Sequence, residues 1–340
     1  VNNYLIGGDS LSAQNTIENT PDSAITLNKG SFNNQIVGNR IVGDNRNFEQ
    51  IGGITTYGAL DSIIRGNTLS DDTAGIRLDA SGSDYSDGIS VVGNNIGVTE
   101  DGTTPLPNRN SGIMVQKANN SIIGGTDPAD ANIIAHNTGY NDYVAGIMIN
   151  NNSTGIAVIG NSIFDNKGLG IDFYGNGVNT NDYNDYDGGV NGLLNFPEGR
   201  RVQESGGNTI IDYRFNGPAG QYRIEFFSNT DPDASGYGEG QTLIGTQNIT
   251  KTGDGYQSFT KTITGTGYTN LALTATEIDA DSPSGFGSTS EFGRLSGVDE
   301  TDLSITKTLT NPRDIAPGAE LDYAITFKNN GPVSVDISQF

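Results

Sequence analysis

The stretch GIAVIGNSIFDNKGLGIDF, residues 155–173, contains both of the short motifs that decide the fold. The first motif, VIGNSI, has the form apolar-x-Gly-Asn-x-apolar, and the second, GIDF, has the form Gly-Ile-x-apolar. Each motif is short, rich in β-branched residues and bounded by Gly or Asn. These features are typical of short strands joined by tight turns.

Both motifs recur through the first half of the chain. The first appears as IVGNRI (36–41), IIRGNTL (63–69), VVGNNI (91–96) and VIGNSI (158–163), and the second as GIRL (75–78), GIMV (112–115), GIMI (146–149) and GIDF (170–173). The second motif starts at residues 75, 112, 146 and 170, at intervals of 37, 34 and 24 residues. A constant unit with loops of variable length predicts a solenoid, in which apolar residues stack between coils about 4.8 Å apart.

The Asn of the first motif falls at the same place in every repeat, as Asn39, Asn67, Asn94 and Asn161. Asn side chains bond readily to nearby backbone at turns. We therefore predict a structural ladder of asparagines along one bend of the solenoid. The single histidine, His136, falls in IIAHNTG and is predicted to occupy a bend as well.

Residues 87–178 carry a resemblance that rests on the combination of NNIGVTEDGTTPLPNRNSGIMV, NNSIIGGTDPADANIIAHNTG and GIAVIGNSIFDNKGLGIDF. This combination resembles the right-handed parallel β-helix repeats of large bacterial secreted and cell-surface proteins. The resemblance implies a right-handed parallel β-helix over residues 1–178, and it implies secretion to an extracellular or cell-surface location. The first ten residues, VNNYLIGGDS, lack the basic and apolar regions of a signal peptide.

After the repeats the pattern changes twice. Residues 179–197 form an acidic linker rich in Asn, Asp and Gly, and from residue 198 alternating segments such as IDYRF (211–215) and YRIEF (222–226) predict half-buried antiparallel strands. Residues 198–299 are thus predicted to form an immunoglobulin-like β-sandwich, and they resemble the sandwich that follows the β-helix in the same surface proteins. Residues 300–340 resemble the opening of an NNGP-type repeat domain, with an open edge that can pair with a second copy.

The charge of the chain limits the classes of partner that it can bind. There are 40 acidic and 18 basic residues, which gives a formal net charge of −22. Such a charge repels nucleic acid and anionic membranes, and no apolar run has the roughly 18 residues needed to span a bilayer. There is no Cys, so disulfides and thiolate sites are excluded. The partners that remain are a second copy, a glycan or a ligand on a host or cell surface.

Clustered carboxylates in loops predict calcium, because Ca²⁺ binds six to eight hard oxygen ligands. The first candidate set lies in the linker and the other two lie in predicted sandwich loops. The three sets are Asp182, Asn184, Asp185 and Asp187; Asp231, Asp233 and Glu239; and Asp279, Asp281 and Glu291. Ordinary turn formation and a solvated acidic hinge are the alternatives for these sets.

Catalysis has to be weighed, since parallel β-helices include polysaccharide lyases, hydrolases and epimerases. A glycosidase needs two carboxylates about 5 to 10 Å apart, and the candidates are Asp71, Asp72, Asp84, Asp87 and Asp172. The sequence offers no clustered Arg and Lys for an acidic sugar and no Trp to stack on sugar rings.

These observations lead to a functional prediction with alternatives. We predict a non-catalytic structural or adhesive extracellular protein, a stiff rod or fibre stabilised by calcium, and not an enzyme. The alternatives are a polysaccharide-active β-helix enzyme and a glycan-binding module.

Overall fold

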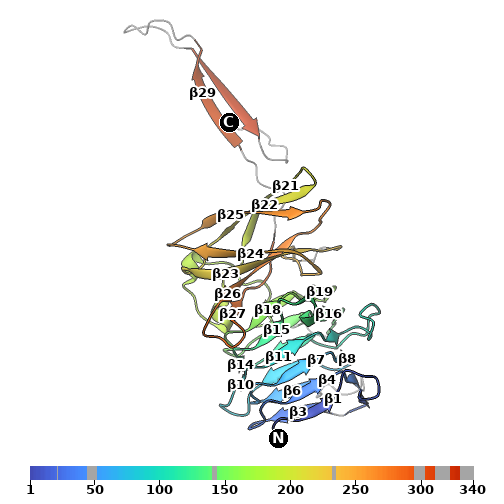
Figure 1. The fold of residues 1–340 in the computed structure, drawn as a ribbon. Coiled ribbons are helices and arrows are strands. Elements are labelled where there is room, and N and C mark those ends of the chain that lie inside the picture. Colours follow the sequence, from blue (N-terminus) through green and yellow to red (C-terminus); the bar gives the residue numbers. More distant parts are fainter. Residues whose placement is uncertain are drawn as a thin grey trace.

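The computed structural model describes residues 1–20, 22–43, 52–139, 144–231, 235–294, 303–310 and 322–329. A stack of short strands makes up the N-terminal half, two antiparallel sheets lie on the end of that stack, and a hairpin stands beyond them (Figure 1). Among the described residues, none of the helices is long and apolar enough to cross a membrane.

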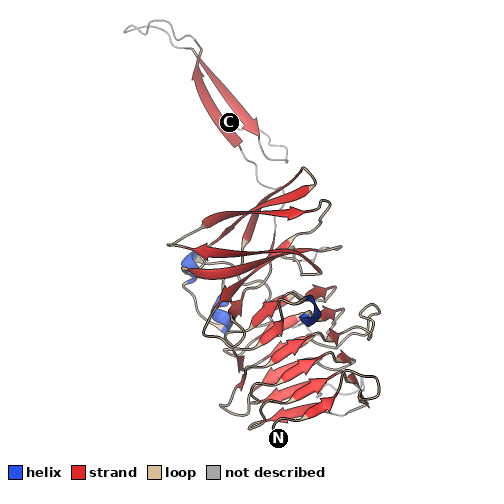
Figure 2. Ribbon diagram, viewed as in Figure 1, coloured by secondary structure: helices blue, strands red, loops and turns tan. Residues whose placement is uncertain are grey.

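Three six-stranded parallel sheets form the stack, and each coil contributes one strand to each sheet. The first sheet contains β1 (Leu5–Gly7), β4 (Gln35–Val37), β7 (Ile63–Arg65), β11 (Ser90–Val92), β15 (Ile122–Gly124) and β18 (Ala157–Ile159). The second contains β2 (Thr16–Glu18), β5 (Arg40–Val42), β8 (Thr68–Ser70), β12 (Asn95–Ile96), β16 (Ile133–Ala135) and β19 (Ser162–Phe164). The third contains β3 (Ile25–Asn28), β6 (Ile54–Tyr57), β9 (Ile76–Asp79), β13 (Ile113–Val115), β17 (Ile147–Ile149) and β20 (Ile171–Phe173). This arrangement is a parallel β-helix, as the repeats predict (Figure 2).

The core of the β-helix consists of apolar side chains that stack in register from coil to coil. In the first sheet the paired central residues are Ile6, Ile36, Ile64, Val91, Ile123 and Val158. All of these except Ile6 are almost fully buried. Because each coil lies about 4.8 Å from the next, the short strands gain their stability from this stacking and not from their length.

The asparagine ladder lies at the corner between the first and second sheets. Its side chains bond in sequence through amide groups, from Asn39 to Asn67 at 3.0 Å and from Asn67 to Asn94 at 3.0 Å. The ladder continues through Asn132, at 2.9 Å, to Asn161, at 2.8 Å. The predicted ladder is therefore confirmed, and it has two more members than the motif indicates, Asn132 and Asn15, whose amide donates to Asn39 at 2.8 Å.

The Gly of the same motif makes the corner sharp. Gly38 and Gly160 have φ angles of 64° and 68°, in the left-handed region that favours glycine. At Gly160 a Cβ atom would lie 2.5 Å from the backbone oxygen of Gly125 in the coil below. The Gly-Asn pair thus combines a turn that only glycine enters easily with a side chain that satisfies the backbone of that turn.

Several small elements complete the β-helix and the linker. They are β10 (Ser86–Asp87) paired with β14 (Ala118–Asn119), and the 3₁₀ turns η1 (Pro128–Asp130), η2 (Tyr183–Asp185) and η3 (Val190–Leu193). His136 lies at a bend with a φ of 58°, and its ring meets the edge of Phe164 at 5.4 Å.

The two antiparallel sheets share a second core. One sheet contains β21 (Glu198–Ser205), β22 (Asn208–Phe215) and β25 (Gln257–Thr264). The other contains β23 (Gly220–Ser228), β24 (Thr242–Lys251), β26 (Ala272–Ile278), β27 (Phe286–Thr289) and β28 (Gly293–Arg294). Tyr213 of the first sheet and Phe226 of the second meet edge to face at 5.3 Å, so the sheets pack face to face.

The second sheet of this sandwich covers the open end of the β-helix. At the edge strand β18, the backbone N–H of Val158 donates to the hydroxyl of Thr289 at 2.8 Å. The N–H of Thr289 in turn donates to the carbonyl of Ile156 at 3.1 Å. The N–H of Gly160 donates to the buried carboxylate of Glu225 at 2.9 Å. The first parallel sheet therefore ends on partners from the sandwich and leaves no bare edge here.

The other two sheets of the β-helix end in the same way. Ile163 of β19 exchanges two backbone bonds with Gly240, at 2.9 and 3.0 Å. At the end of β20, the N–H of Phe173 donates to Glu291 at 2.7 Å. Three apolar residues of the sandwich and its C-terminal loop, Phe227, Ala272 and Phe292, belong to the β-helix core cluster. The sandwich is thus the C-terminal cap that a solenoid requires.

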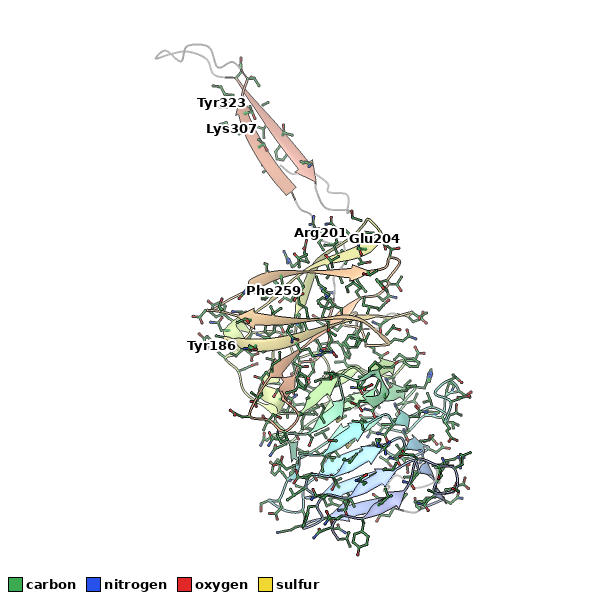
Figure 3. The ribbon with its side chains drawn as sticks, viewed as in Figure 1. Tyr186, Arg201, Glu204, Phe259, Lys307 and Tyr323 are labelled. Carbon is green, nitrogen blue, oxygen red and sulfur yellow. The ribbon has the colours of Figure 1, made fainter. Side chains whose placement is uncertain are left out.

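Beyond the sandwich lies a two-stranded hairpin, β29 (Leu303–Leu309) and β30 (Tyr323–Asn329). Lys307 and Tyr323 lie on this hairpin, with the ammonium group 4.0 Å from the centre of the ring (Figure 3). Ile305 and Ile325 are 62% and 56% exposed. Residues 330–340, the last part of the segment that resembles the NNGP-type domain, fall outside the described residues.

Candidate functional site

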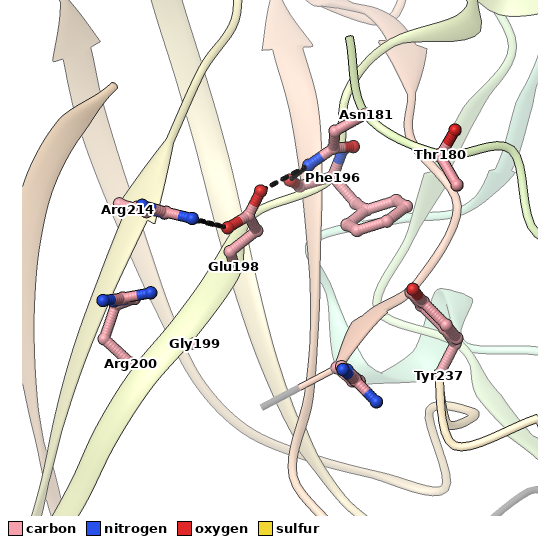
Figure 4. A pocket seen from close by; sticks show the side chains of 9 residues that line it. Thr180, Asn181, Phe196, Glu198, Gly199, Arg200, Arg214 and Tyr237 are labelled. Carbon is pink, nitrogen blue, oxygen red and sulfur yellow. Dashed lines mark hydrogen bonds and ion pairs between the residues drawn. The ribbon is translucent and has the colours of Figure 1, made fainter. Parts of the chain in front are cut away.

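A pocket of about 320 Å³ lies where the linker meets the sandwich. Its walls come from three separate parts of the chain: the linker, the first strands of the sandwich, and the loop and strand that close the second sheet. The lining residues are Thr180, Asn181, Phe196, Glu198, Gly199, Arg200, Arg214, Tyr237 and Arg294 (Figure 4). Three of the 18 basic residues of the chain therefore face one small pocket.

One wall of the pocket is fixed by a charged network around Glu198. Arg214 donates to one carboxylate oxygen of Glu198 from two of its nitrogens, at 2.8 and 2.5 Å. The hydroxyl of Tyr256 donates to the other oxygen at 2.7 Å, and the Arg214 guanidinium lies 3.9 Å from the centre of the Tyr256 ring. These bonds, together with one from Asn181, lower the pKa of Glu198 despite its partial burial. Glu198 is therefore ionised at neutral pH and holds Arg214 in place.

The opposite wall combines a cation with two aromatic rings. The guanidinium of Arg294 lies 5.5 Å from the centre of the Tyr237 ring. Tyr237 in turn meets Phe196 edge to face, with ring centres 5.5 Å apart. Arg294 is exposed and makes no ion pair with any described residue. This wall offers a positive charge and an aromatic surface to a ligand.

No local signal in the sequence indicates this cluster, because Arg200, Arg214 and Arg294 are spread over nearly a hundred residues. The adjacent Arg201 does not line the pocket and pairs with Asp212 at 2.9 Å, whereas Arg200 lines the pocket. The register of β21 against β22 shifts between Gly199 and Arg201, so Arg200 is the extra residue of a bulge and has no paired residue on β22.

The linker carboxylates that we predicted as calcium ligands are partly brought together. Asp182, Asp185 and Asp187 place carboxylate oxygens within 4.8 Å of one another. Asn184 does not join them, because its buried side chain bonds to the hydroxyl of Tyr186 and to the backbone of Gly255. Three of the four predicted ligands thus form a compact cluster.

The carboxylates of this cluster are placed unfavourably in the absence of a cation. Burial and then the charges of Asp182 and Asp187 raise the pKa of Asp185 to about 7. One oxygen of Asp182, Oδ1, is buried and has no hydrogen-bond partner among the described residues. A bound cation would relieve both features. Calcium at this cluster remains a prediction.

The other two predicted calcium sets are not brought together within the described residues. Asp279 and Asp281 lie in the turn between β26 and β27, whereas Glu291 lies at the far end of that hairpin and accepts the N–H of Phe173. Glu291 therefore terminates the β-helix and is not part of a loop site with the two aspartates.

A similar correction applies to Glu239. It accepts both the backbone N–H and the side-chain amide of Asn166, at 3.2 and 3.0 Å. It thus ends a second asparagine ladder, which runs from Asn108 through Asn137 to Asn166. Asp231 is exposed, and Asp233 lies outside the described residues. The physical reason is the same as for Glu291: a buried coil end offers N–H groups that a carboxylate satisfies.

The carboxylates that we considered for catalysis have diverse surroundings. Asp84 pairs with Lys29 at 2.5 Å, and Asp87 accepts a bond from Asn120 at 3.1 Å. Asp172 is only 3% exposed, and burial raises its pKa to about 6. Asp72 is fully buried, in contrast to a carboxylate that faces a substrate groove.

A second, shallower pocket of about 300 Å³ lies along the outer face of β11 and β15. The turn with Pro283 and Phe286 overhangs it, and Ser90, Asn120 and Asp130 contribute polar groups. The described residues contribute no cation to this pocket.

The solved structures that match the chain include two of a bacteriophage tailspike protein. No family model matches the chain, and no curated protein sequence matches it. The first structure is the enzymatically active domain of tailspike protein 2 from bacteriophage CBA120, with 15% identity, a TM-score of 0.28, and coverage of 83% of this chain and 50% of that chain. The second is the full-length tailspike protein 2 of an Escherichia coli O157:H7 bacteriophage, with 15% identity, a TM-score of 0.24, and coverage of 83% and 45%. This chain spans about half the length of the tailspike chains.

These comparisons correct our functional prediction. The first structure is that of an enzymatically active domain, which contradicts the prediction of a non-catalytic structural or adhesive protein and the prediction that the chain is not an enzyme. The alternative, a polysaccharide-active β-helix protein, is the one that we take forward.

Proposed function

We propose that this chain is a polysaccharide-active β-helix protein whose sugar site is the pocket lined by Arg200, Arg214, Arg294, Phe196 and Tyr237. The observation that carries the proposal is the convergence of guanidinium groups and aromatic rings in one concave site. Sugar sites need groups that donate hydrogen bonds to ring oxygens and hydroxyls, and flat apolar surfaces for the C–H faces of the ring. This pocket supplies both.

The chemistry of the lining residues bears on the class of reaction. Hydrolysis of a glycosidic bond needs two carboxylates. Among the described lining residues only Glu198 is a carboxylate, and it is held by Arg214 and Tyr256. Arginines beside a phenol favour elimination or epimerisation at an acidic sugar over hydrolysis. In such a reaction the cations offset the charge that develops on the substrate.

The proposal extends to the remaining parts of the chain. The two antiparallel sheets support an immunoglobulin-like sandwich, and the β29–β30 hairpin supports the opening of an NNGP-type repeat domain. An extracellular location follows from the same proposal, since large polysaccharides are met outside the cell. The handedness of the β-helix is proposed to be right-handed, in keeping with the rule for parallel crossover connections.

The test is direct. The purified chain is incubated with a panel of acidic and neutral polysaccharides, and the products are assayed for new reducing ends and for unsaturated sugar residues. Binding is measured in parallel on immobilised glycans. Unsaturated products from an acidic polysaccharide are the expected result. Failure to bind or alter any polysaccharide in the panel would overturn the proposal.

A further inference from the structure

We infer that the pocket recognises a sugar carboxylate, as in a uronic acid, and that Arg294 and Arg200 bind this carboxylate while Tyr237 and Phe196 flank the sugar ring. The inference rests on the proposed function, because it names the substrate class of the same site. It goes further by assigning the specificity to particular residues.

Arg294 differs from most of the described arginines in having no ion pair with a described residue. In a chain with 40 acidic and 18 basic residues, a carboxylate partner is easily found. Most described arginines have one: Arg40, Arg65, Arg77, Arg201, Arg214 and Arg223 all form ion pairs. Arg294 forms none with a described residue and faces a pocket. Because its side chain is exposed and lines the pocket, an anion that enters the pocket meets this guanidinium group.

The charge of the pocket lining differs in sign from that of the whole chain. The pocket is lined by three guanidinium groups and one carboxylate, so positive charge exceeds negative charge by two. The chain as a whole carries a formal charge of −22. An acidic polysaccharide is repelled by most of this surface and attracted here, because a concave site focuses its own field.

The three arginines of the pocket have different roles. Arg214 is held by two bonds to Glu198 and by the ring of Tyr256, so it is a positioning residue that shapes the wall. Arg200 and Arg294 line the pocket from β21 and β28, which contact one another. Planar guanidinium groups suit a carboxylate, which accepts paired hydrogen bonds.

The aromatic residues of the pocket lie where the sugar ring would be placed. Tyr237 lies between Arg294 and Phe196, within 5.5 Å of each. A carboxylate bound by Arg294 therefore places the ring that carries it beside Tyr237. A free carboxylate, such as acetate, would use the arginines alone, so the aromatic wall accounts for selection of a cyclic acidic sugar.

The experiment compares Arg294→Gln and Arg200→Gln with Arg201→Gln as a matched control. Arg201 is the neighbour of Arg200 on the same strand, but it does not line the pocket and it pairs with Asp212. Binding is measured by calorimetry, at low and high salt, with a uronic acid oligosaccharide, a sulfated oligosaccharide and a neutral oligosaccharide of similar length. Thermal unfolding confirms that each variant is folded.

The expected result is a loss of uronate affinity of about tenfold or more for Arg294→Gln and Arg200→Gln, since a charge-assisted hydrogen bond is removed. Arg201→Gln should stay within about twofold of the wild type, because its ion pair is exposed. Wild-type affinity should fall as salt rises, and the neutral oligosaccharide should bind about tenfold more weakly than the uronate.

The outcomes distinguish this inference from the proposed function. Equal binding of neutral and uronate chains, with no effect of Arg294→Gln, overturns the inference and leaves the proposed function standing. Arginine-dependent binding of the uronic acid oligosaccharide, without binding or alteration of any polysaccharide, supports the inference and overturns the proposed function. Tighter binding of the sulfated oligosaccharide overturns the assignment to a carboxylate.

Discussion

Asn94 lies in the middle of the main asparagine ladder and shows how single residues hold the β-helix together. Its side-chain oxygen accepts from both the backbone and the side chain of Asn67, at 2.9 and 3.0 Å. Its amide donates to the carbonyl of Ile64 at 2.9 Å and to Asn132 at 2.9 Å. Because the site is fully buried, water cannot replace these partners.

We predict that Asn94→Ala lowers the free energy of unfolding by about 2 to 4 kcal/mol, because it leaves buried donors and acceptors of two neighbouring coils unsatisfied. The control is Asn28→Ala on the exposed side of β3, which should cost less than about 0.5 kcal/mol. Denaturant unfolding of both variants makes the comparison. Equal stability of the two variants would show that the ladder is not structural.

Glu291 gives the stability a dependence on pH. Burial raises its pKa to about 7, whereas an ordinary glutamate in the unfolded chain titrates near 4.5. The folded state therefore binds the proton more tightly than the unfolded state. Stability from this group is fully present below pH 4.5 and is lost as the pH rises through about 7.

We predict that Glu291→Gln removes this contribution, which amounts to at most about 3 kcal/mol. Unfolding free energies at several pH values between about 4 and 8 give the slopes for the wild type and the variant. The slope should be smaller in Glu291→Gln, although Asp172, with a pKa raised to about 6, retains part of it. An unchanged slope would rule out titration of Glu291 in this range.

At the residue scale, residues that recur in a repeated motif can be predicted from the sequence, whereas residues that meet only in the folded chain cannot. Asn39, Asn67, Asn94 and Asn161 follow a fixed motif, so their ladder could be predicted. Asn132 lacks the preceding Gly and was missed, although it belongs to the same ladder. The arginine pocket had no local signal, because its residues meet only when the sandwich folds against the linker.

At the scale of elements, the junction between the β-helix and the sandwich is the part that the sequence predicts least. The carboxylates of Glu239 and Glu291 suggest calcium when they are viewed as part of acidic loops. In the structure they accept N–H groups at the end of the last coil. Sequence periodicity describes contacts between like coils, and it contains no information about what closes the stack.

We predict that Phe292→Ala destabilises the β-helix and the sandwich together. Phe292 is 4% exposed and belongs to the β-helix core cluster, and a buried Phe→Ala change typically costs about 3 to 5 kcal/mol. Hydrogen exchange should show faster opening of β18 and β20. Phe259, half-buried on the far sheet of the sandwich, is the control, and its replacement by Ala should leave exchange in β20 unchanged (Figure 3).

We predict that calcium binds the linker cluster of Asp182, Asp185 and Asp187 and raises the melting temperature. A ligand at 100 times its Kd stabilises the folded state by about 2.7 kcal/mol. Chelator should reverse the shift, Asp185→Asn should abolish it, and Asp279→Asn should leave it intact. A melting temperature that is the same with calcium, with chelator and with neither would show that the cluster is only an acidic turn.

At the scale of the whole molecule, the charge distribution links the fold to the proposed function. The chain as a whole carries a formal charge of −22, and one end of its β-helix is closed by the sandwich (Figure 1). The positive pocket lies on the sandwich side of this junction. An acidic polysaccharide would therefore be directed to one end of the molecule, and the rest of the surface would keep it from binding elsewhere.

The most direct test of this account is the action of the wild type and of Arg294→Gln on an acidic polysaccharide, assayed by direct binding and by the appearance of unsaturated products. The account predicts that the wild type binds and alters a polyuronate, and that Arg294→Gln loses about 90% or more of this activity, which corresponds to a tenfold change. Equal activity of the two proteins, or no activity of the wild type on any acidic polysaccharide, would contradict it.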